Sequence, residues 1–169
     1  MPIEEVIIKL PYFDIVSVKW APNTNEREAA WQLFVEFSTR ITSIKRELGP
    51  EGDFGSARLA MNSLYNLMDT SRKILREAGP SIAKKTESLG PITIYVLNQS
   101  IRKILDDYHT KLEAFESLRE PHIDRVKHER EWPLYENFWH QMVDMQEGIR
   151  EFTKALEEIA GVKSYSKDN

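Results

Sequence analysis

The sequence predicts an all-α fold: an antiparallel bundle of four long helices, preceded by a short extended or β-structured N-terminal arm. Apolar residues recur three and four positions apart in four separate segments. A strand cannot satisfy this spacing, because its side chains change face at every residue. Glycine and proline fall between the segments, at Gly49-Pro50, Gly79-Pro80 and Pro121. A chain of 169 residues is long enough to bury one sizeable core, so we expect a single domain.

Residues 1–22 are predicted to form the arm, as an extended segment or a hairpin. The stretches IEEVIIKL and FDIVSVKW are rich in β-branched residues, lack a helical stripe and are separated by Pro11. A two-stranded ribbon is marginally stable alone in water, so the arm needs a surface to pack against. That surface is either its own bundle or another chain, through strand pairing or self-association. The candidate interaction residues of the arm are Phe13, Ile15, Val18 and Trp20.

The first helix is expected over about 23–48. Its start, Asn23-Thr-Asn-Glu26, resembles a capping box, in which Asn23 accepts from the first turn and Glu26 reaches back. Trp31 lies one position past the apolar stripe and is the fifth candidate interaction residue. We interpret the dense segment KWAPNTNEREAAWQLF (19–34) as a joint that fixes the arm to the bundle, rather than as a ligand site.

Three further helices are expected over about 54–78, 91–119 and 133–160, within a bundle spanning 23–161. Pro91 suits a first helical turn, where its missing N–H is not needed. Helices of roughly 25 residues are about 38 Å long, so the four elements match in length. Residues 162–169 are expected to be a flexible tail. The most regular stripe belongs to the fourth helix and consists of Tyr135, Phe138, Met142, Met145, Ile149, Phe152, Leu156 and Ile159.

Composition and charge exclude several function classes. The net charge of −4 argues against a nucleic-acid partner, which usually requires a basic face. The absence of cysteine excludes disulfides, thiolate metal sites and a cysteine nucleophile. The apolar runs are too short to span a membrane, so no membrane partner is expected. A cytoplasmic location is the default expectation. A lipid- or membrane-acting effector would need its apolar helix faces to become exposed, and nothing in the sequence requires that. No cofactor is expected.

One pair of residues suggests an enzyme as the alternative. Arg102 and His109 lie seven positions apart, on one face of the third predicted helix. The spacing is similar to the Arg-x(4–6)-His motif of the HEPN family, all-helical proteins many of which are metal-independent RNases of toxin and defence systems. The resemblance implies that His109 is the general acid–base, that Arg102 stabilises the phosphate charge, and that two protomers combine their motifs. The family motif usually sits late in the chain, whereas here it sits in the third helix of four. The other interpretation is that both side chains are solvated flank positions.

Long helical bundles often contain a di-metal site. Such a site takes inward carboxylates from two helices and Glu-x-x-His from each of the other two. The chain offers Asp106 with His109 and, at a spacing of four, Glu136 with His140. These four residues are the candidate metal ligands. The stripe positions that would hold ligands are apolar, so we expect no metal.

Three motifs resemble a family of uncharacterised bacterial helical proteins. They are W-A-P-N-x-x-E-R-E-A-A-W (20–31), L-Y-x-L-x-x-T-S-R-x-I-L-R-E-x-G-P (64–80) and H-E-R-E-W-P (128–133). The resemblance implies a bacterial origin and an all-helical fold, and no activity. We therefore expect a non-enzymatic interaction or assembly module that binds a protein partner or itself, through the arm or a bundle face. The alternative is the RNase that uses Arg102 and His109.

Overall fold

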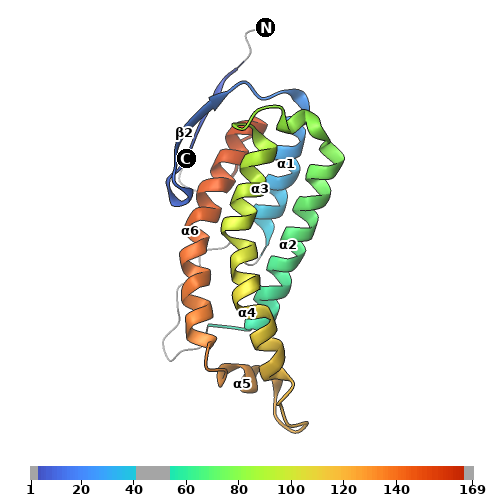
Figure 1. Cartoon of the computed structure of the whole chain (residues 1–169), viewed down its shortest axis with the longest axis vertical. Helices are drawn as coiled ribbons and strands as arrows, with labels where there is room; N and C mark the ends of the chain where they lie inside the picture. The colour runs from blue at the N-terminus through green and yellow to red at the C-terminus, as the bar shows by residue number, and fades with distance from the viewer. Residues whose placement is uncertain (1–3, 41–53, 166–169) are drawn as a thin grey trace.

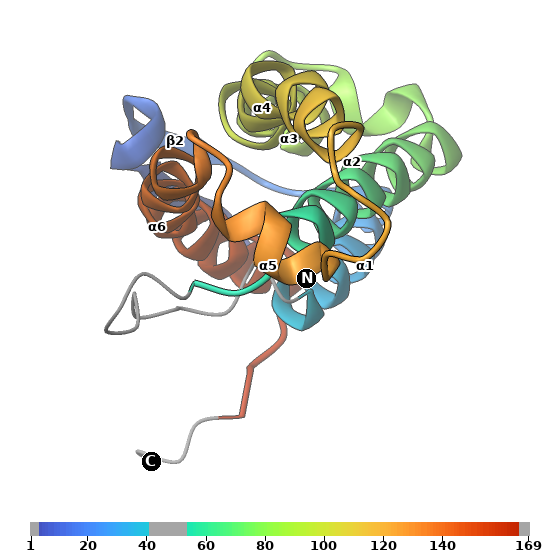
Figure 2. The same cartoon turned by 90° about the horizontal axis from the view of Figure 1, so that it is seen from below.

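The computed structural model describes residues 4–40 and 54–165, and it is mostly helical (Figure 1). The all-α class with an N-terminal arm is confirmed. Long helices run side by side along the molecule, and a short one, α5, lies across its lower end (Figures 1 and 2). The helices described in these ranges are α1 (Thr24–Thr39), α2 (Ala57–Ala78), α3 (Leu89–Gln99), α4 (Ile101–Glu116), α5 (Arg125–Arg130) and α6 (Tyr135–Ala160), with 3₁₀ turns η1 (Pro11–Phe13) and η4 (Pro80–Ala83).

The prediction of four long helices holds only in part. Helices α2 and α6 have 22 and 26 residues, close to expectation. The predicted third helix is divided into α3 and α4 at Ser100, whose backbone leaves the helical region (φ −117°, ψ −85°). The Ser100 hydroxyl donates to the Val96 carbonyl at 2.5 Å, a back-bond of the kind that bends helices. Helix α5 occupies the predicted connection 120–133, and the predicted end of the first helix, 41–48, lies outside the described residues.

The arm is a hairpin of β1 (Val6–Leu10) and β2 (Ile15–Trp20), paired antiparallel. Side chains alternate between its faces, and the inner face (Ile8, Leu10, Val18 and Trp20) is buried. The hairpin packs on α6 of its own chain, which supplies the surface that an isolated ribbon lacks.

Tyr12, at the tip of the hairpin, fixes it to α6. Its hydroxyl donates to Asp144 at 2.8 Å, and its backbone N–H donates to Glu151 at 3.0 Å. Its ring lies directly over Gly148, where a side chain would collide with it. The glycine in the middle of α6 therefore allows the close approach of the arm.

One buried carboxylate, that of Glu26, joins the arm, α1 and α3. Its Oε2 accepts from the backbone of Asn23 at 2.9 Å, and Asn23 in turn accepts from the backbone of Glu26, so the predicted capping box is present. Its Oε1 accepts from the indole of Trp20 at 3.2 Å and from the backbone N–H of Leu89, at the start of α3, at 3.1 Å. The bonds from Trp20 and Asn23 match the joint that we predicted, and the one from Leu89 extends it to α3.

The core lies between the long helices and is rich in aromatic rings. Phe37 of α1 meets Phe152 of α6 edge to face, with centroids 5.2 Å apart. At the lower end, Trp132, Tyr135, Phe138 and Trp139 are all buried. These aromatic side chains are therefore part of the core rather than the wall of an open pocket.

Candidate functional site

An open groove of about 530 Å³ runs between α2 and α4, and both residues of the RNase hypothesis lie on it. Arg102 and His109 come from α4, while Arg72 and Tyr65 face them from α2. A smaller hollow of about 310 Å³ adjoins it and shares Tyr65 and His109. The groove floor is formed by Met68 and Leu105. The helices therefore bring two guanidinium groups, an imidazole and a phenol to one surface hollow.

The charges of this groove are weakly paired. Arg102 is 59 % exposed and lies 3.5 Å from Asp106, one turn along α4. His109 lies 3.9 Å from Glu113, and the Arg72 side chain has no ion-pair or hydrogen-bond partner within the described chain. Guanidinium groups bind phosphate and carboxylate oxygens in a bidentate manner. Arg72 and Arg102 can therefore hold an anion in the groove, with His109 beside it.

The candidate metal ligands do not gather. Asp106 and His109 lie on α4, whereas Glu136 and His140 are exposed on the first turns of α6. The residues that the structure describes contain no group of three or more histidine, aspartate or glutamate side chains arranged to hold a metal ion.

The candidate interaction residues divide into two sets. Phe13, Val18 and Trp20 are buried against the chain's own bundle, and Ile15 is half-buried. Trp31, in contrast, is 48 % exposed.

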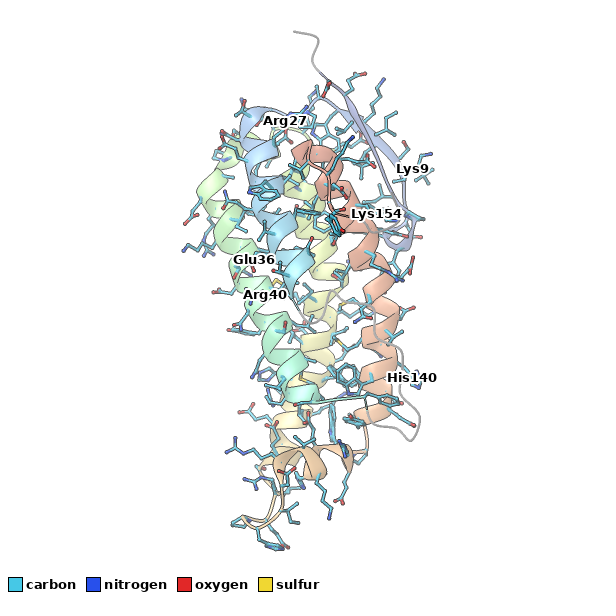
Figure 3. The ribbon with its side chains drawn as sticks, turned by 180° about the vertical axis from the view of Figure 1, so that it is seen from behind. Lys9, Arg27, Glu36, Arg40, His140 and Lys154 are labelled. Carbon is cyan, nitrogen blue, oxygen red and sulfur yellow. The ribbon has the colours of Figure 1, made fainter. Side chains whose placement is uncertain are left out.

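Trp31 is the centre of a surface that we call the α1 patch, formed by Trp31, Phe34 and Val35. The rings of Trp31 and Phe34 stack with centroids 5.9 Å apart, and Val35 is exposed beside them. Next to the patch a groove of about 340 Å³ runs between α1 and α6. In Figure 3 these two helices face the viewer, with Arg27 and Glu36 on α1 and Lys154 on α6.

The H-E-R-E-W-P motif has a structural role that sequence reasoning missed. Glu129 is buried, and its carboxylate caps α2 by accepting from the Arg58 backbone at 2.5 Å and from the Ser56 hydroxyl at 3.1 Å. Burial raises the pKa of Glu129, and the hydrogen bonds from Arg58 and Ser56 oppose that rise. His128 stacks on Phe115 with centroids 4.2 Å apart. Arg58, which donates to Glu129, lies 71 residues away, and no pattern in a single sequence indicates a contact over that distance.

Comparisons of the chain with models of protein families, with curated proteins and with solved structures find no match. No helix in the described part of the chain is long and apolar enough to cross a membrane.

Proposed function

We propose that this chain is a non-enzymatic assembly module that pairs with a second copy of itself through the α1 patch. The observation that carries the proposal is the exposure of Trp31. A tryptophan that is half exposed and stacked on Phe34 presents a rigid apolar surface at little cost in side-chain entropy. Tryptophan is also among the residues most enriched at the energetic centres of protein interfaces.

The surroundings of the α1 patch suit pairing with an identical surface. In a two-fold interface each residue meets the same patch of the other chain, so a rim of one sign would repel itself. Figure 3 shows side chains of both signs on the two helices beside the patch: Arg27 and Lys154 are positive, and Glu36, which pairs with Arg40, is negative. Two-fold pairing can therefore place opposite charges across the axis.

The test is the molar mass in solution of the wild type and of Trp31→Ala, measured by light scattering over a concentration series. Removing a tryptophan from the centre of an interface costs about 2 kcal/mol or more, which is about 30-fold in the dissociation constant. We expect a dimer for the wild type and a shift to monomer for the variant. Leu118 is an exposed apolar residue in the turn after α4, so Leu118→Ala is the matched control and should remain dimeric. A wild type that stays monomeric, or a Trp31→Ala variant as dimeric as the control, would contradict the proposal.

Deletion of the arm is a poor test of assembly. The inner face of the hairpin is buried on α6, so its removal would expose the core of the same chain. A change of mass after such a deletion would follow from the exposed core alone.

A second candidate function is a metal-independent RNase. The specific observation in its favour is that Arg102 and His109 share one groove with Arg72. In this mechanism His109 moves the proton and the two guanidinium groups stabilise the charge on the phosphate.

The RNase candidate is tested by cleavage of a fluorogenic RNA in the presence of a chelator. Arg102→Ala and His109→Ala should each abolish the cleavage. Lys103→Ala should not, since that exposed neighbour does not line the groove. Absence of cleavage by the wild type, or equal activity of all four proteins, would refute this candidate.

A further inference from the structure

Another hollow, of about 710 Å³, lies where α2 begins, α4 ends and α5 crosses the lower end of the molecule. Its volume falls within the range of small-molecule sites, about 300–1,000 Å³. Two apolar side chains line it from different helices: Leu59 of α2, which is 64 % exposed, and Val126 of α5. We call this hollow the α5 cleft.

The α5 cleft is held in shape by bonds between its three helices. Arg58 of α2 makes two hydrogen bonds to Glu116 of α4, at 2.7 and 2.8 Å. Glu129 of α5 caps α2, and His128 of α5 approaches the Phe115 carbonyl of α4 to 2.9 Å. A ligand would meet a preformed site, which lowers the entropy lost on binding.

Two arginines on the walls, Arg119 and Arg125, have no carboxylate partner in an ion pair among the residues that the structure describes. Glu116 balances Arg58, and Glu129 is buried beneath the helix end that it caps. The remaining carboxylates of the lining are Glu113 and the buried Glu129. The Arg125 side chain has no ion-pair or hydrogen-bond partner among residues 4–40 and 54–165.

Arg119 is already oriented by its own loop. Its guanidinium donates to the backbone carbonyl of Ile123 at 2.5 Å, which holds it at the cleft. A guanidinium held in place loses less entropy when it takes up a carboxylate. Two arginines beside two apolar side chains select a ligand with an anionic end and an apolar body.

We propose that the α5 cleft binds a small amphiphilic carboxylate, with its apolar body between Leu59 and Val126 and its carboxylate at Arg119 and Arg125. The contact is reversible and involves no chemistry. It is independent of self-association, because the α1 patch and the α5 cleft share no residue.

The experiment uses the fluorescent dye anilinonaphthalene sulfonate, which combines an apolar body with an anionic group, and octanoate as its competitor. Octanoate should displace the dye, and octylammonium, which has an alkyl chain of the same length and the opposite charge, should not. Arg125→Glu should weaken octanoate binding about tenfold or more, since it replaces an attractive charge by a repulsive one. Lys127→Glu makes the same charge change on the same helix outside the cleft and should alter binding by less than about twofold.

A second pair of variants tests the apolar wall. Leu59→Gln should weaken octanoate binding, whereas Leu118→Gln, an exposed leucine outside the cleft, should not. Trp31→Ala should bind octanoate as the wild type does, so that failure of the assembly proposal leaves this one standing. The inference is overturned if octanoate does not displace the dye, if octylammonium displaces it equally well, or if Arg125→Glu and Lys127→Glu bind alike. Circular dichroism establishes that each variant is folded.

Discussion

Replacing Glu26 by alanine should destabilise the whole molecule, because one carboxylate serves three donors from three parts of the chain. Trp20, Asn23 and Leu89 would each lose their acceptor, and the bonds from Trp20 and Leu89 are buried. A buried donor left without a partner costs about 1–3 kcal/mol. Two such donors give a loss of about 2–6 kcal/mol, which in a chain of this size lowers the melting temperature by about 4–24 °C.

The assay is urea unfolding followed by circular dichroism, together with thermal melting. Glu28→Ala is the matched control, because Glu28 is exposed on the same helix and should change the free energy of unfolding by less than about 0.5 kcal/mol. Glu26→Gln keeps one acceptor oxygen but presents an amide N–H₂ to the remaining donors. Its loss in free energy of unfolding should therefore lie between those of Glu26→Ala and Glu28→Ala. If Glu26→Ala were no less stable than Glu28→Ala, the idea that this carboxylate joins arm, α1 and α3 would be wrong.

Three further predictions follow from the buried polar groups and the close contact at the arm. Burial raises the pKa of Glu129 above the ordinary glutamate pKa, so the stability that Glu129 contributes is present below the ordinary pKa and is lost as pH rises through the raised pKa. Urea unfolding from about pH 4 to 7 should therefore show a decrease in the free energy of unfolding that Glu129→Gln lacks. Burial, and then its bond to Asp144, raise the pKa of Tyr12 to about 12. The difference in ultraviolet absorbance between wild type and Tyr12→Phe should titrate there, and a midpoint near 10 would refute this. Gly148→Ala should cost about 1–3 kcal/mol by collision with the Tyr12 ring, and Tyr12→Ala in the same chain should remove that cost.

The helices were predictable where local rules decide them. The apolar stripe of α6 and the capping box at Asn23 and Glu26 can be recognised in the sequence, because the residues that form each pattern lie within one or two helical turns of one another. The packing of the arm on α6 was left open by the sequence. It depends on the approach of Tyr12 to Gly148, two residues 136 positions apart.

The break at Ser100 and the role of Glu129 were not predicted. Ser100 lies in an otherwise continuous apolar pattern, and serine is tolerated in helices unless its hydroxyl bonds back to the preceding turn. The pairing of Glu129 with the start of α2 joins distant segments, and a single sequence carries no signal for such a contact. The same limit applies to the candidate sites. The Arg102 and His109 spacing was visible, whereas Arg72 opposite them was not.

The most direct test of assembly through the α1 patch is a distance measured between two chains. The sequence contains no cysteine, so Ser38→Cys, an exposed position on α1 beside the patch, can carry a single nitroxide label. Asn66→Cys, exposed on α2 beside the α2–α4 groove, is the control. Pulsed electron resonance should detect a short, well-defined distance between the Ser38→Cys labels of two chains. This distance should disappear when Trp31→Ala is added. The Asn66→Cys labels should give a longer distance. Assembly through the α1 patch would be contradicted if the Ser38→Cys labels showed no coupling between chains, or if their coupling persisted without Trp31.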